Sequence, residues 1–131
     1  MKTEFSRQEI GRFGEKHCEK YLKRTKKLKI YAKNARIGHL EADIIAYNKE
    51  SIIFVEVKTR SKDKKNFLTP ADSVDLDKRN NLINFAYSFV RTLPTKLQNL
   101  SIRIDVCEIW VVTDKKLRVC DFNYIENAVT K

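Results

Sequence analysis

The chain has 131 residues and a mass of 15.4 kDa, which suits a single domain (residues 1–131) with an ordinary hydrophobic core. Hydrophobic residues make up 42% of the sequence and aromatic residues 10%, a composition that excludes an intrinsically disordered protein. Lysine and arginine number 27 against 17 aspartate and glutamate, so the formal net charge is +10. This excess favours a polyanionic partner, either nucleic acid or an anionic membrane surface.

Membrane insertion and zinc binding are both disfavoured. No apolar stretch approaches the roughly 18 residues of a membrane-spanning helix, and Met1–Glu4 does not open a signal peptide. The three cysteines, Cys18, Cys107 and Cys120, have no CxxC spacing, and the two histidines do not complete a zinc pattern. We therefore expect no membrane partner, and free thiols in a reducing cytoplasm.

The first expected element is a helix from Arg7 to about Lys26. Ser6 and Glu9 fit a capping box, and apolar residues follow at helical spacing. Glu15 falls at the edge of the apolar stripe, so we expect it to border the core. The alternative is an exposed Glu15 that pairs with neighbours one helical turn away.

Three strands are expected next, and the last two form a hairpin. Leu28–Lys33 predicts the first strand, with Asn34–Glu41 as a connection. Ala42–Tyr47 and Ile52–Lys58 predict two strands around a four-residue turn. That turn length would pair Tyr47 with Ile52 and therefore Asp43 with Glu56.

Opposed carboxylates at Asp43 and Glu56 would repel each other unless a cation lies between them, because directly paired side chains have Cβ atoms about 4.5–5.5 Å apart. Mg²⁺ (or Mn²⁺), which takes hard oxygen ligands, is the natural occupant. Side chains alternate along a strand, so Lys58 shares a face with Glu56 and could position or deprotonate a water molecule. The alternative for these three residues is a structural salt bridge at the rim of a sheet.

The second half of the chain predicts a loop, a helix and a hairpin. Ser61–Thr69 is polar and lysine-rich, which is typical of a surface loop. A helix should begin in Thr69–Asp72, where Pro70 suits its first turn, and end near Thr92. Lys78 falls within its apolar stripe, either at an active site or as an outward-turned rim lysine.

Ser101–Thr113 and Leu117–Phe122 predict the closing hairpin, in which Arg103 and Asp105 form a structural ion pair. The order is then helix, three strands, helix, two strands. This pattern predicts an α/β fold with a mixed central sheet flanked by helices.

An aspartate followed after a dozen residues by Glu-x-Lys on a hairpin, with a preceding helix that bears a glutamate, resembles the PD-(D/E)XK superfamily of restriction-endonuclease-like proteins. The motifs also resemble the YraN-type family of small endonuclease-like bacterial proteins, over most of the chain. The segments that carry this resemblance are Gly11–Glu15, Asn34–Arg36, Glu41–Ile45, Phe54–Arg60, Lys78 and Arg103–Val106.

The resemblance implies a restriction-endonuclease-like core and a Mg²⁺-dependent nuclease. It gives Asp43 and Glu56 the role of metal ligands, Lys58 that of the catalytic lysine and Glu15 that of the first-helix acid. In this hypothesis the Val57 carbonyl would assist at the metal. Arg36, Arg60 and Lys78 would hold phosphate oxygens.

Two other functions stay open. The chain could be a nucleic-acid-binding module that keeps the fold without turnover, or a basic protein whose partner is an acidic protein or a membrane. The sequence leaves open DNA or RNA as the substrate, with DNA preferred, and a monomer or a homodimer as the assembly.

Two basic clusters bear on recognition. One lies in Lys23–Arg36, and the other comprises Arg60, Lys62, Lys64 and Lys65, directly after Lys58. A run of lysines is often only a solvated face, but the second cluster could guide a phosphate chain towards the metal. Because lysines contact the backbone and do not read bases, we expect structure-dependent or non-specific binding that weakens as salt rises.

Overall fold

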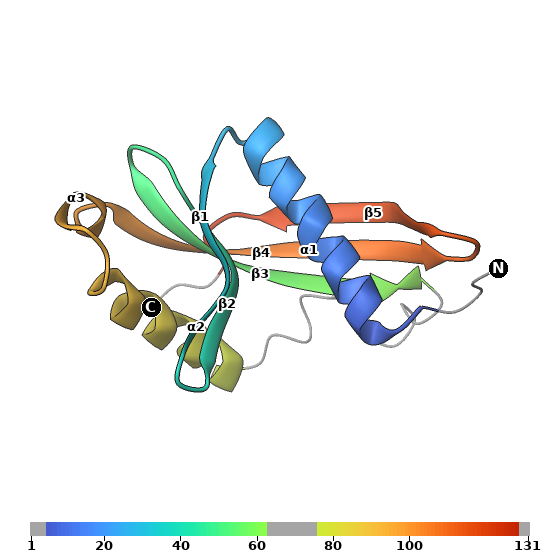
Figure 1. Cartoon of the computed structure of the whole chain (residues 1–131), viewed down its shortest axis with the longest axis horizontal. Coiled ribbons are helices and arrows are strands. Elements are labelled where there is room, and N and C mark those ends of the chain that lie inside the picture. The colour runs from blue at the N-terminus through green and yellow to red at the C-terminus, as the bar shows by residue number, and fades with distance from the viewer. Residues whose placement is uncertain (1–4, 63–75, 129–131) are drawn as a thin grey trace.

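The computed structural model describes residues 5–62 and 76–128, with only the backbone at residues 76–79. Its architecture is the α/β arrangement that the sequence predicts, with one mixed five-stranded sheet and helices against it (Figure 1). The elements follow the order α1 (Arg7–Arg24), β1 (Lys29–Ile37), β2 (Leu40–Tyr47), β3 (Ser51–Ser61), α2 (Leu76–Val90), α3 (Thr95–Gln98), β4 (Ser101–Thr113) and β5 (Leu117–Ile125).

The strands are arranged in chain order across the sheet, from β1 at one edge to β5 at the other. Neighbouring strands are antiparallel except for β3 and β4, which are parallel and joined by the α2 crossover. β3 is therefore the central strand, and its run Ile52–Val55 is completely buried.

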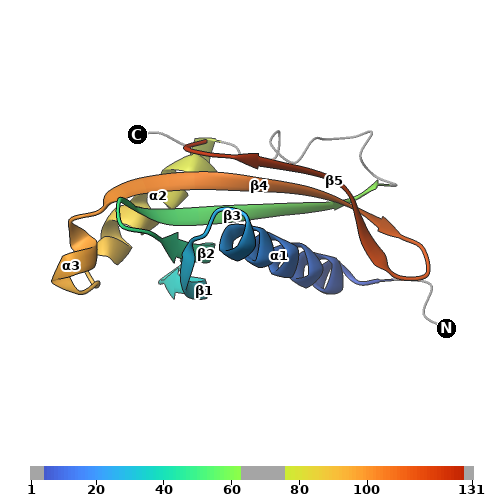
Figure 2. The ribbon, with the colours of Figure 1, turned by 90° about the horizontal axis from the view of Figure 1, so that it is seen from above.

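Alternation along β3 divides the core between two faces. Phe54 packs with Phe85 of α2 in one cluster, whereas Val55 packs with Cys18 and Leu22 of α1 in the other. The two helices therefore cover opposite faces of the sheet, and Figure 2 shows α1 lying along one of them.

The α1 helix begins as predicted and ends slightly early. Ser6 and Glu9 form the expected capping box. The helix ends at Arg24 and not near Lys26, because Lys27 adopts a positive φ of 58° that turns the chain into β1.

The prediction of a connection at Asn34–Glu41 is wrong. β1 runs on to Ile37 and β2 starts at Leu40, so only two residues join them. Gly38 has a φ of +61°, which a tight hairpin turn requires and glycine adopts readily.

The remaining boundaries differ less. Ser101–Thr113 is a strand as predicted, and β5 continues three residues beyond the expected end at Phe122. The short α3 helix was not predicted, and α2 ends at Val90. β3 runs on to Ser61, three residues beyond the expected end at Lys58, so the expected loop Ser61–Thr69 does not begin at Ser61. The rest of that loop from residue 63 and the expected helix start in Thr69–Asp72 lie outside the described residues.

Candidate metal and nuclease site

The candidate site lies where β2 and β3 separate. The two strands pair from Tyr47–Ile52 to Ile44–Val55, which confirms the predicted register up to that point. Beyond it β2 pairs only with β1, and β3 only with β4. Figure 1 shows β2 turning away from β3 here, and we call this opening the β2–β3 fork.

The expected ladder pair of Asp43 with Glu56 does not form, because the ladder ends one step earlier. The Val57 backbone N–H instead donates a hydrogen bond to Asp43 Oδ2 over 2.7 Å. Burial, and then the negative charge of Glu56, raise the pKa of Asp43 to about 7, although the hydrogen bond from Val57 opposes this. The Glu56 carboxylate therefore lies close enough for its negative charge to disfavour the ionisation of Asp43.

Glu56 and Lys58 occupy the face of β3 that carries Phe54. Lys58 Nζ lies 2.9 Å from Glu56 Oε1, and both side chains are only 8% exposed. The salt bridge that the sequence offered as an alternative is therefore formed. It also holds the lysine ammonium against the Glu56 carboxylate.

A close contact at Gly14 brings α1 to this region. A Cβ at Gly14 would overlap Thr59 Oγ1 and lie 2.9 Å from Thr59 Cβ. The absence of a side chain thus lets the helix backbone rest directly on β3, one residue after Lys58.

Glu15 follows this contact and is half-buried. Burial raises its pKa, a hydrogen bond with Asn34 lowers it, and the negative charges of Glu41 and Glu56 raise it again. The pairing role suggested as an alternative belongs to Glu19, which binds Lys23 and Lys33 at 3.0 Å each. Glu15 therefore lies within electrostatic reach of the fork and not in open solvent.

Mg²⁺ suits the donor atoms of the fork. Asp43 and Glu56 offer hard carboxylate oxygens whose mutual repulsion a divalent cation would relieve, and Mg²⁺ commonly uses one or two carboxylates and keeps several waters. The described residues contain no group of three or more metal-binding side chains of His, Cys, Asp or Glu. A bound ion would therefore depend on this carboxylate pair, with water and the backbone (the Val57 carbonyl in the sequence hypothesis) completing its shell.

The predicted phosphate-binding residues differ in exposure and in their contacts. Arg36 is exposed and pairs with Glu41 across the β1–β2 hairpin at 3.1 Å. Arg60 is half-buried, and its Nη1 donates to the Thr59 carbonyl over 3.2 Å. Lys62 is exposed. Lys64, Lys65 and the side chain of Lys78 lie outside the described residues.

The sequence reading missed Glu108 and Asn123. Glu108 is the β4 neighbour of Lys58 in the parallel register, and it is buried. Asn123 Nδ2 on β5 donates to Glu108 Oε1 over 2.9 Å. The available signal was an acid between apolar neighbours in a strand, Cys107 and Ile109, similar to the signal that identified Glu56.

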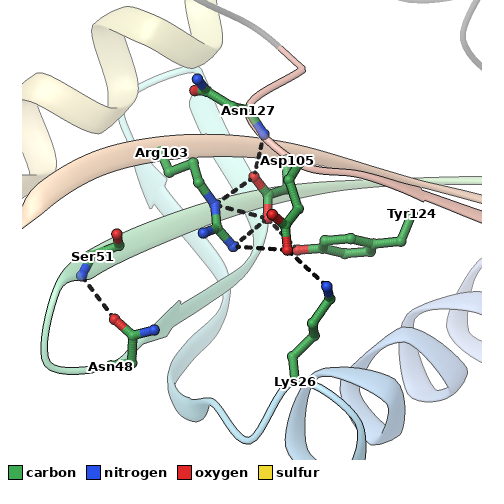
Figure 3. A network of polar contacts seen from close by, with 8 residues as sticks. Lys26, Asn48, Ser51, Arg103, Asp105, Tyr124 and Asn127 are labelled. Atoms are coloured by element: carbon green, nitrogen blue, oxygen red, sulfur yellow. Dashed lines mark hydrogen bonds and ion pairs between the residues drawn. The ribbon is translucent and has the colours of Figure 1, made fainter.

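A second buried carboxylate, Asp105, serves the fold. Its side chain is completely buried and accepts hydrogen bonds from Arg103, from the Tyr124 hydroxyl at 2.6 Å and from the Asn127 N–H at 2.8 Å (Figure 3). The predicted Arg103–Asp105 ion pair is confirmed. The cluster ties β4 to the end of β5, so it is structural.

None of the helices in residues 5–62 and 76–128 has the length and apolar character needed to span a bilayer. All three cysteines are free thiols, as expected.

Comparison with known proteins identifies the family. The chain is 41% identical to a UPF0102 protein of Clostridioides difficile over 120 aligned residues, and the alignment covers 92% of this chain and 96% of that protein. It is 34% identical to a UPF0102 protein of Caldanaerobacter subterraneus, over 91% of this chain and 93% of that protein. A model of the uncharacterised protein family UPF0102 matches residues 14–109, which include Glu15, Asp43, Glu56 and Lys58. The chain therefore belongs to the uncharacterised protein family UPF0102, the YraN-type family that its motifs resemble.

Proposed function

We propose that the protein is a Mg²⁺-dependent nuclease of the PD-(D/E)XK type that cleaves phosphodiester bonds, with DNA as the preferred substrate. The observation that carries this proposal is the β2–β3 fork, where Asp43, Glu56 and Lys58 converge from two strands. The order of helices and strands also matches the core of that superfamily.

Each residue has a role that follows from its position. Asp43 and Glu56 would hold the ion, and Glu15 on α1 would act through a coordinated water or at a second ion. When bound, Mg²⁺ supplies Lewis acidity to the phosphate and lowers the pKa of a coordinated water. Lys58 presents its ammonium from the Glu56 ion pair, where it can orient the attacking water and stabilise the charge that develops on the phosphate oxygens.

A cleavage assay tests the proposal. Labelled single-stranded, duplex and branched DNA, together with RNA, would be incubated with Mn²⁺ or Mg²⁺ and with a chelator. We expect metal-dependent cleavage by the parent protein and none by Asp43→Asn or Glu56→Gln. Asp121→Asn, an exposed aspartate on β5, is the matched control and should cleave like the parent. Cleavage that survives in Asp43→Asn would indicate a contaminating nuclease and refute the assignment.

Metal binding is measured separately through thermal stability. An ion that binds only the native state stabilises it by RT ln(1 + c/Kd) at ion concentration c, so the melting temperature rises with the logarithm of that concentration once it exceeds Kd. Mn²⁺ should therefore raise the melting temperature of the parent protein and leave Asp43→Asn unchanged. Equal shifts in both proteins would place the ion elsewhere.

The buried ion pair favours one alternative, a nucleic-acid-binding protein that keeps the fold without turnover. Lys58 Nζ lies 2.9 Å from Glu56 Oε1, as in a structural pair. This alternative predicts binding of nucleic acid with no cleavage and no metal-induced shift in melting temperature.

A further inference from the structure

The outer surface of α1 carries an uninterrupted row of cations. Arg12, Lys16, Lys20 and Arg24 recur at every fourth residue, and all four side chains are exposed. Residues four apart are neighbours on a helix surface, and each step rises about 6 Å, so the row spans about 18 Å. We call these four residues the α1 ridge.

The carboxylates of α1 contact partners other than the ridge residues. Glu9 accepts from the Ser6 N–H in the capping box, Glu15 hydrogen-bonds Asn34, and Glu19 binds Lys23 and Lys33. None of the ion pairs among the described residues involves a ridge residue. Like charges four residues apart destabilise a helix slightly, so the ridge keeps a repulsion that a polyanion would relieve.

The ridge is fixed relative to the β2–β3 fork. Gly14, which lies between Arg12 and Lys16, rests directly on Thr59. Glu15 lies within electrostatic reach of Glu56, while the ridge side chains are exposed. In the described part of the chain, α1 forms the outermost layer on its side of the sheet (Figure 2).

We propose that the α1 ridge binds the phosphate backbone of the nucleic-acid substrate, an inference that rests on the proposed function. The four cations of the row would contact up to about four phosphates of the backbone. Its side chains have no access to base edges from such a position, so the ridge sets orientation and affinity and does not select sequence.

Two triple variants with the same net charge test the proposal. The ridge variant is Arg12→Gln, Lys16→Gln, Lys20→Gln, in which glutamine keeps the helix propensity. The control is Lys49→Gln, Lys96→Gln, Lys116→Gln, three exposed lysines in the β2–β3 turn, α3 and the β4–β5 turn. Each variant lowers the formal charge from +10 by three, to +7.

Affinity for labelled duplex and single-stranded oligonucleotides would be measured in chelator, without cleavage, between about 50 and 200 mM salt. Each lost phosphate contact lowers the slope of log K against log salt by about 0.9 on duplex and 0.7 on single strands. We expect the ridge variant to lose about two to three contacts and roughly 10- to 100-fold in affinity at low salt. The control should retain nearly the parent slope.

The proposal fails if both triple variants weaken binding equally, if the ridge variant binds like the parent, or if the parent binds no nucleic acid. It also fails if the ridge mediates equal or stronger binding to phosphatidylserine vesicles than to nucleic acid. Phosphatidylcholine vesicles are the neutral control. Ridge-dependent binding without metal-dependent cleavage would refute the proposed nuclease activity but support nucleic-acid binding by the ridge. If the ridge variant cleaves and binds with unchanged affinity, the ridge proposal is refuted and the nuclease proposal stands.

Discussion

The Asp43 carboxylate hydrogen-bonds the Val57 N–H at the point where the backbone of β2 no longer pairs with β3. At this position a hydrogen bond from Val57 to the Asp43 side chain replaces the backbone pairing between β2 and β3. The same contact places an acidic group, partly deprived of water, next to Glu56. Asp43 therefore contributes both to the contact between β2 and β3 and to the candidate metal site.

The first prediction concerns pH. The pKa of Asp43 is about 7 in the native protein against 3.8 ordinarily, so the native state binds this proton more tightly than the unfolded chain. Its contribution to the free energy of unfolding therefore falls as pH rises from about 4 to about 7 and is level above that. Asp43→Asn keeps an acceptor for Val57, so in chelator it should be about 2–4 kcal/mol more stable than the parent near pH 8.

Chemical denaturation near pH 4.5, 6 and 8 measures this effect. The advantage of Asp43→Asn should shrink as the pH falls, whereas Asp121→Asn should follow the parent at every pH. An Asp43→Asn protein that is no more stable than the parent near pH 8 would mean that the carboxyl is not held in an unfavourable environment.

The second prediction compares the two glycines inside α1. Gly14→Ala places a methyl group against Thr59, where overpacking typically costs about 1–3 kcal/mol. Gly11→Ala meets no atom within 4 Å and should stabilise the helix by about 0.5–1 kcal/mol. Urea denaturation of both variants checks this difference in sign. If Gly14→Ala were as stable as Gly11→Ala, α1 would not rest on β3 as described.

The third prediction separates the two roles of Lys58. Lys58→Met removes the cation beside Glu56 and should lower cleavage by about 10²- to 10⁴-fold, the usual contribution of such a group. Its affinity for nucleic acid should change little, because the ridge and other basic residues contact the backbone.

Lys58→Arg is the informative companion, since it keeps the positive charge next to Glu56. We expect it to recover the stability lost in Lys58→Met without recovering full cleavage, because the guanidinium differs in shape. Cleavage by Lys58→Met at the parent rate would reduce Lys58 to a salt-bridge partner.

The fourth prediction compares two aspartate–arginine pairs. Asp105→Asn leaves the Arg103 guanidinium without its buried counter-charge, and breaking such a pair typically costs about 3–5 kcal/mol. Asp114→Asn disrupts an exposed pair with Arg118 at 2.9 Å and should be indistinguishable from the parent. Thermal and urea unfolding would show the contrast. Equal effects would mean that the Asp105 cluster does not stabilise the domain.

Local patterns in the sequence were sufficient for most of the fold. The capping box at Ser6 and the apolar strand Ile52–Val55 correspond to real elements, because each pattern is short and has one strong physical cause. The hairpin register followed from turn length alone and held as far as Ile44–Val55. The prediction ended β1 too early, although Asn34–Ile37 alternates polar and apolar residues. Gly38 is compatible with either a tight turn or a longer loop, so the sequence around it did not by itself indicate a two-residue turn.

The candidate site was less accessible to sequence reasoning. The divergence of β2 from β3 depends on how β1, β2 and α2 pack together, so the pairing of Asp43 with Val57 had no local signal. Glu108 is similar, because its position beside Lys58 depends on a parallel register set by the α2 crossover. Long-range topology, and not residue type, determined both.

The central position of β3 has a consequence for hydrogen exchange. Ile52–Val55 is paired on both sides and buried, so its amides should exchange only when the whole sheet opens. β1, at the edge of the sheet, can open locally. Glu56 directly follows the protected segment and Lys58 lies two residues later, so the residues proposed to carry the chemistry are anchored to a part of the chain that we expect to exchange slowly. The β1–β2 hairpin that supplies Asp43 can instead fluctuate around them.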